Sequence, residues 1–272
     1  MAAKLKPISK KARTLRPVHP NRGIEADYRK RLNAEIEAMH RSILRFVIAT
    51  YRANEPRIAQ DESPADALRR TMKDLAKRWN KRFDDMATKL AAHFAQSVET
   101  RSSQGLKKIL KDGGWSVEFS ITPAMRDVMD ATVHENVGLI RTIPEQYLSA
   151  VEGIVYRGVQ NGRDIGLIAK ELQHRLGVTK RRAALISRDQ VEKATSSFVR
   201  ARHLEVGVET ARWQHSAGGR TPRHEHVKAS RDGVIYNVRE GWLDPDEGRH
   251  IQPGELIGCR CVAIPIVPGF YG

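Results

Sequence analysis

The feature that most constrains the fold is a stripe of large apolar residues that recurs at three- and four-residue steps over residues 68–98. This period predicts an amphipathic helix, and neither Gly nor Pro interrupts it before Gly105. Ser63 followed by Pro64 is typical of a helix start. A helix over 64–104 would be about 60 Å long at the usual rise per residue, which is more than a small globule can cover. We therefore expect residues 64–112 to pair with another helix of the chain, with a second copy of it, or with both.

The regions on both sides of this stripe also show helical periodicity. Apolar residues over 24–51 predict one amphipathic helix. Residues 122–206 predict a bundle of four helices joined by short loops, because Pro144, Gly162 and Gly177 interrupt the pattern and are typical of helix ends. Between the two regions, residues 115–121 alternate and predict a short strand or an extended connector.

After Gly207 the pattern changes to short segments separated by turns rich in Gly, Pro and Asp. Residues 210–214, 234–238 and 259–267 predict strands. The predicted fold is mainly α, with long N-terminal helices and a helical bundle, followed by a small α+β module. We divide the chain into a disordered basic arm at 1–22, a long-helix region at 23–121, the bundle at 122–206 and the module at 207–272.

The charge of the chain favours a polyanionic partner. A nucleic acid is the first candidate and an anionic membrane is the second. The net charge is +15, and an excess of positive charge attracts the phosphate groups of nucleic acids to the protein surface. No segment approaches the roughly 20 apolar residues that span a bilayer, and the N-terminus lacks the apolar core of a secretory signal. Residues 1–22 contain no acid, and their basic side chains are the candidate phosphate contacts: Lys4, Lys6, Lys10, Lys11, Arg13, Arg16 and Arg22.

Two short motifs in the C-terminal module combine the residue types of a metal site. They are H-E-H at 224–226 and C-R-C at 259–261. Two thiolates and two imidazoles form a tetrahedral zinc site, and a module of about 60 residues gains most from such a staple. Both spacings are shorter than those of common zinc motifs, so the alternative is that the Cys residues pack as small apolar side chains. The candidate ligands of a structural zinc are His224, His226, Cys259 and Cys261.

The sequence holds no strong enzymatic signature. It lacks the G-x-S-x-G nucleophile elbow, a Walker A motif and G-x-G-x-x-G. The carboxylates near the H-E-H motif follow no spacing typical of a metal-dependent nuclease. Two hypotheses therefore stand, a structural protein without turnover and a metal-dependent nucleic-acid enzyme that uses the His and Cys residues.

Several elements in a fixed order resemble the phage Mu F-type minor head proteins, the phage head morphogenesis family. They are L-I-x-x-I-P-x-Q-Y at 139–147, G-V-Q-N-G at 158–162, R-A-A-L-I-S-R-D-Q at 182–190, Trp213, R-x-x-R-H at 220–224, D-G-V at 232–234 and G-C-R-C at 258–261. The resemblance covers residues 123–267, and this chain departs from the family in having two His at 224–226 where one is usual.

The resemblance implies a structural protein of a tailed-phage head, present in few copies and associated with the portal or the major capsid protein. It further implies contact with packaged double-stranded DNA, a role in head morphogenesis and in genome packaging and ejection, and no catalysis or cofactor. The implied location is the head interior of the virion, with the host cytoplasm as the place of assembly. The basic arm and the long helix agree with such a role, because one suits dense DNA and the other suits assembly with neighbours.

Overall fold

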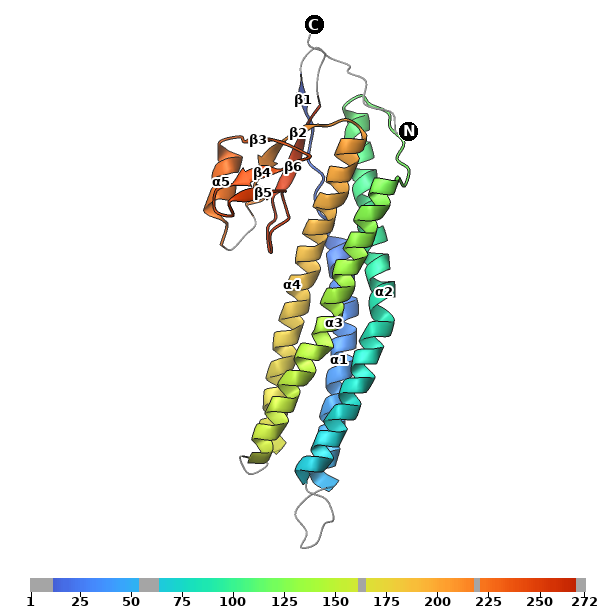
Figure 1. The fold of residues 1–272 in the computed structure, drawn as a ribbon, viewed down its shortest axis with the longest axis vertical. Coiled ribbons are helices and arrows are strands. Elements are labelled where there is room, and N and C mark those ends of the chain that lie inside the picture. Colours follow the sequence, from blue (N-terminus) through green and yellow to red (C-terminus); the bar gives the residue numbers. More distant parts are fainter. Residues whose placement is uncertain (1–11, 54–63, 161–164, 218–220, 268–272) are drawn as a thin grey trace. The chain divides into compact units, whose positions relative to one another are not determined.

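The computed structural model describes residues 12–53, 64–160, 165–217 and 221–267. A two-residue strand precedes four long helices, and a short helix and the other short strands follow them in the chain (Figure 1). The predicted fold class, mainly α with a small α+β module, is confirmed. The helices are α1 (Arg22–Ala53), α2 (Pro64–Asp112), α3 (Pro123–Gln160), α4 (Ile165–Glu205) and α5 (His224–Arg231).

The chain divides into two compact units, and each of the four long helices contributes residues to both. The helical unit comprises Ala26–Ala92 and His134–Ser187. The sheet unit comprises Met1–Glu25, His93–Val133 and Arg188–Gly272, and it contains α5 and all the strands of the described residues.

In the helical unit, the apolar stripe predicted on α2 is buried within the single chain. Helix α1 is its partner, since Arg82 of α2 pairs with Glu35 of α1 at 2.7 Å and Thr71 bonds Thr50 at 3.1 Å. These residues of the stripe are therefore covered inside one chain. Its buried members in this unit are Leu68, Met72, Leu75, Trp79, Phe83 and Leu90.

The predicted four-helix bundle over 122–206 is wrong, because two long helices occupy this range. Helix α3 continues through Pro144 and helix α4 continues through Gly177. A proline inside a helix removes one backbone hydrogen bond and a glycine costs about 1 kcal/mol relative to alanine. Burial outweighs both costs, since the apolar face of α3 runs on from Ile140 and Ile143 to Tyr147.

The sheet unit contains a four-stranded antiparallel sheet in the order β1-β6-β2-β3. Its core includes Trp213, whose side chain is 1% exposed, and it extends to Trp115 and Val117 of the connector after α2. A separate pair of strands, β4 and β5, lies next in the chain. The strands are β1 (Arg13–Thr14), β2 (Thr210–Gln214), β3 (Ile235–Asn237), β4 (Trp242–Asp244), β5 (Arg249–Ile251) and β6 (Val262–Val267).

The prediction of a disordered arm over 1–22 is wrong for the described residues from 12 on. Arg13 and Thr14 pair with Val267 and Ile266 of β6, and the Leu15 backbone N–H bonds the Pro265 carbonyl at 3.0 Å. An extended segment satisfies its backbone groups by joining an open sheet edge, which the charge pattern alone does not predict. Residues 1–11 lie outside the described residues.

A buried ion-pair network joins α2 to the C-terminal end of α4 in the sheet unit. The Arg202 guanidinium bonds Glu99 at 2.7 Å, Glu205 at 2.7 Å and Ser103 at 2.9 Å, and its side chain is 2% exposed. It also donates to the Ser120 carbonyl at 2.7 Å. The network therefore fixes the connector that follows α2.

Helix α4 ends where the predicted change of pattern begins. Gly207 has a φ of 82°, and the Val208 N–H bonds the His203 carbonyl at 2.8 Å. This left-handed glycine terminates the helix and turns the chain into β2. No helix of the described residues is long and apolar enough to cross a membrane.

Candidate metal centre

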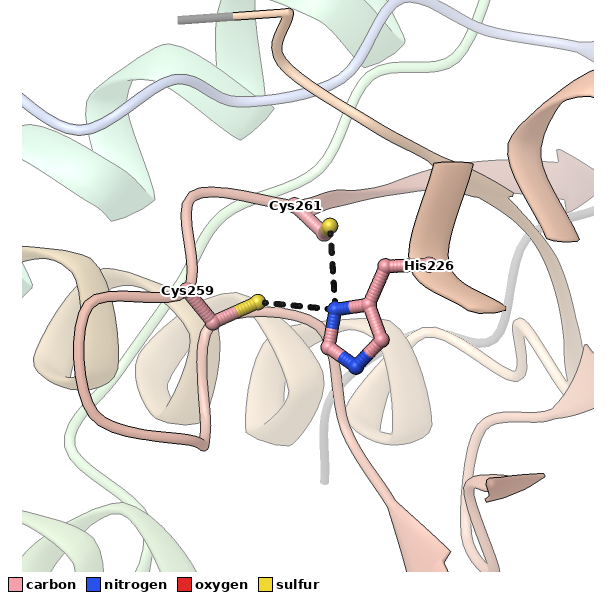
Figure 2. Close-up of side chains that lie close together, drawn as sticks. All are labelled: His226, Cys259 and Cys261. Atoms are coloured by element: carbon pink, nitrogen blue, oxygen red, sulfur yellow. Dashed lines mark hydrogen bonds between the residues drawn. The ribbon is translucent and has the colours of Figure 1, made fainter. Parts of the chain in front are cut away.

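Three of the four predicted metal ligands come together in the sheet unit. Nδ1 of His226 lies 3.5 Å from Sγ of Cys259 and 3.6 Å from Sγ of Cys261 (Figure 2). The three ligand atoms lie within 4.8 Å of one another, and all three residues are buried. Both cysteines are free thiols. The structure thus brings together one imidazole and two thiols, a donor set that zinc accepts.

The fourth predicted ligand, His224, lies apart from this cluster. Its side chain is 84% exposed, and its Nδ1 lies 2.9 Å from Glu225 Oε1. The reason is helical geometry, because both histidines belong to α5 and residues two apart on a helix point about 200° from each other. The expectation that all four side chains converge is therefore wrong.

Two loop contacts hold the C-R-C segment against the helices of the sheet unit. The Gly258 N–H donates to Asp189 Oδ1 of α4 at 2.6 Å, and the Arg223 guanidinium donates to the Ile257 carbonyl at 3.1 Å. Gly254 has a φ of 81°, and a Cβ there would meet the Glu192 carbonyl oxygen at 3.2 Å. The loop therefore packs closely on α4, and Arg223 links it to the start of α5.

Asp244 orients the imidazole of His226 from the side opposite the thiols. Its Oδ2 lies 3.0 Å from Nε2 of His226, and its side chain is 1% exposed. A carboxylate accepts hydrogen bonds, so this contact assigns the proton to Nε2 and directs Nδ1 toward the cysteines. Carboxylates hold metal-binding histidines in the same way. Sequence reasoning missed Asp244 because it falls in a stretch interpreted as turns.

Aromatic rings enclose the histidine. The ring of Trp213 lies 5.0 Å from that of His226 between centroids, and the ring of Trp242 lies 5.8 Å away, both at steep angles. The two indoles also contact each other at 4.9 Å. The imidazole therefore has a fixed position, with its two nitrogens directed at Asp244 and at the cysteines.

The two thiols and the imidazole shift one another's pKa values. The hydrogen bond with Cys261 lowers the pKa of Cys259 despite burial, and His226 adds to this effect. The same hydrogen bond raises the pKa of Cys261, as does burial. Burial alone would lower the pKa of His226, but Cys259 and Asp244 outweigh it and the pKa is raised. The cluster therefore stabilises one thiolate, which is the form that binds metals.

The predicted phosphate contacts divide between described and undescribed residues. Arg16 forms an ion pair with Asp112 at 2.8 Å, and Arg22 contacts the buried Glu192 at 2.8 Å. Arg13 donates to the Gly113 carbonyl at 3.5 Å. These three side chains thus have partners within the chain, while Lys4, Lys6, Lys10 and Lys11 lie outside the described residues.

Comparison with known proteins bears on the same part of the chain. Residues 149–264 match the family described as Phage Mu protein F like protein. This region of the chain is therefore similar to the phage Mu F-like family. The expected resemblance is confirmed, and the matched range contains α4, His226, Cys259 and Cys261. The segment 139–147, which we also assigned to the resemblance, precedes this range.

One curated relative aligns with most of the chain. It is an uncharacterized protein of Haemophilus influenzae, 26% identical over 268 residues. The alignment covers 97% of this chain and 58% of the relative, so the chain spans less than two thirds of that protein's length. No solved structure matches the chain.

Proposed function

We propose that this protein is a structural component of a tailed-phage head that acts in head morphogenesis. The observation that carries the proposal is the phage Mu F-like match over residues 149–264. The matched range includes the R-A-A-L-I-S-R-D-Q motif, and Asp189 of this motif holds the Gly258 backbone N–H. Part of the family pattern thus has a structural explanation in how α4 fixes the closing loop.

The finer part of the proposal concerns partners and place. We assign the protein to the interior of the phage head, in contact with the portal or the major capsid protein, after assembly in the host cytoplasm. The net charge of +15 supports contact with packaged double-stranded DNA during packaging and ejection.

The structural role is favoured over a metal-dependent nucleic-acid enzyme. Among the described residues, the cluster that would hold a catalytic metal is buried, with His226, Cys259 and Cys261 at 2%, 3% and 4% exposure. A phosphodiester must reach the metal to be cleaved, and these three side chains are buried. The burial of the cluster therefore favours a role in folding over catalysis.

The direct test is co-purification of the tagged full chain with heads assembled by its own phage. We expect the chain to sediment with intact heads and with isolated portal or capsid protein. Sedimentation with neither would contradict the proposal. DNA cleavage that depends on added zinc and is lost in His226→Ala would establish the enzyme instead.

A second test addresses the DNA contact. Substitution of Lys4, Lys6, Lys10 and Lys11 by Ala removes the basic side chains of the arm that lie outside the described residues. We expect weaker binding to duplex DNA and a shallower dependence on salt, since the slope of log affinity against log salt is roughly 0.9 per phosphate neutralised. The matched control removes the same charge from exposed lysines of α2: Lys73, Lys77, Lys89 and Lys108. Equal slopes for the two variants would contradict a specific role of the arm.

A further inference from the structure

His226 faces two sulfur atoms with a single nitrogen, and no protonation state satisfies both contacts. Asp244 accepts a hydrogen bond from Nε2–H. Nδ1 can therefore either accept one hydrogen bond through its lone pair or, when the ring is protonated, donate one. The two sulfurs nevertheless lie at nearly equal distances, 3.5 Å and 3.6 Å. One hydrogen bond accounts for one of these contacts, and the remaining thiol can bond to the neighbouring sulfur, so the imidazole nitrogen alone does not explain why both sulfurs lie equally close to it.

A metal ion between the three atoms accounts for both distances. A tetrahedral zinc with Zn–S of about 2.3 Å and Zn–N of about 2.0 Å places nitrogen and sulfur about 3.5 to 3.6 Å apart. The observed separations match this edge length.

We propose that His226 Nδ1, Cys259 Sγ and Cys261 Sγ bind one zinc ion, with Asp244 as the positioning residue for His226. Soft thiolates combined with an imidazole select zinc over the harder magnesium and calcium. Among the described residues no fourth His, Cys or carboxylate joins these three, so the proposal assigns three protein ligands.

The ligands come from two segments of the sheet unit that are distant in the sequence. His226 lies on α5, while Cys259 and Cys261 lie just before β6. Arg223 at the start of the helix also donates to the Ile257 carbonyl. The zinc therefore staples α5 to the closing strand, and a structural metal of this kind contributes directly to folding. This inference is independent of the proposed role in the phage head.

The test begins with the unmodified full chain, purified with its native metal under reducing conditions. We expect elemental analysis to give about one zinc per chain, as for a structural site. Replacement by Co²⁺ adds a thiolate-to-cobalt charge-transfer band and the visible bands of a tetrahedral ion. Chelation lowers the melting temperature and makes both thiols reactive. A wild-type chain with substoichiometric zinc and no cobalt charge-transfer band would overturn the proposal, as would a disulfide between the two cysteines in place of the metal.

Variants separate the ligands from their neighbours. Cys259→Ser and Cys261→Ser are expected to lose the metal and the charge-transfer intensity. His224→Ala is the matched control, because it lies on the same helix two residues from His226 and is exposed, and it keeps about one zinc per chain. Loss of zinc from this variant to the same degree would overturn the assignment.

Asp244→Asn tests the positioning role without removing a ligand. The variant retains the two thiols and the imidazole, so its metal stoichiometry is unchanged. We expect its affinity to fall roughly 10- to 100-fold in competition with a chelator. Helix content measured by circular dichroism distinguishes this effect from unfolding. An unchanged affinity in the folded variant would show that Asp244 does not act through His226.

Discussion

The interior of each of the two compact units is stabilised by a different kind of interaction. The helical unit is formed by apolar stripes, and its buried polar side chains among the described residues are amides, hydroxyls and the histidine His40, whose pKa is lowered by burial. The sheet unit buries carboxylates and a guanidinium, including Glu99, Glu192, Arg202 and Asp244. Burying a charge is costly unless it has partners, so the sheet unit depends on particular pairs and the helical unit depends on packing.

The largest expected effect follows from breaking the buried network of the sheet unit. Arg202→Ala leaves Glu99 and Glu205 buried without their cation. Removal of one partner of a buried pair costs about 3–5 kcal/mol. Chemical denaturation followed by circular dichroism should show this loss. A change below 1 kcal/mol, on the order expected of an exposed pair, would remove the contrast between the two units.

The next prediction concerns pH. Burial lowers the pKa of His203 to about 4, and among the described residues neither ring nitrogen has a hydrogen-bond partner. Because the folded pKa is below the ordinary value of about 6.5, the unfolded state binds the proton more tightly. Stability is therefore full above about pH 6.5 and falls as the pH drops toward 4, by about 3 kcal/mol at most.

Replacement of this histidine isolates its contribution. His203→Gln should flatten the dependence of unfolding free energy on pH between 4 and 6.5, relative to the unmodified chain. The control is His134→Gln, which changes an exposed histidine of the helical unit and should leave the curve unchanged. Identical slopes for the two variants would contradict the assignment.

The helical unit should respond more weakly to the loss of a buried polar contact. Tyr28 donates to Asn136 Oδ1 at 2.9 Å between α1 and α3. Tyr28→Phe keeps the ring in place and removes this hydrogen bond, at a cost of about 1 kcal/mol. A loss as large as that of Arg202→Ala would show that specific polar pairs matter equally in both units.

The smallest effect is expected at an exposed ion pair of the helical unit. Arg141 and Asp84 lie 2.7 Å apart, and both side chains are 52% exposed. Surface pairs contribute less than about 1 kcal/mol because water and salt screen them. Thermal melts of Arg141→Ala should therefore nearly overlay those of the unmodified chain, and a drop comparable to Tyr28→Phe would refute this ranking.

The same contrast explains what the sequence could predict. The α2 stripe was predictable because its period repeats for many turns, and burial confirms it from Leu68 onward. The helix ends predicted at Pro144 and Gly177 were wrong, because the local preference of Pro and Gly to end a helix is outweighed by the burial of a continuous apolar face. Strand β2 was predicted with its observed bounds, since the change of pattern after Gly207 is sharp.

The candidate metal centre was predictable in part. Residue types identified His226, Cys259 and Cys261, but the H-E-H motif gave no means to choose between its histidines without a helix assignment. With α5 placed at residues 224–231, helical geometry excludes one of the two. Asp244 and Asp189 were missed because their roles depend on contacts with residues far along the chain.

The pairing of β1 with β6 has a consequence for how the protein is made. Arg13 lies opposite Val267, so the sheet joins residues from near the two ends of the described chain. During synthesis β1 is made well before β6, so it waits for its partner strand. Contacts of such high sequence separation form slowly, and the unpaired edge is open to neighbouring chains until then. Completion of this sheet is therefore the step at which nascent chains compete between folding and aggregation.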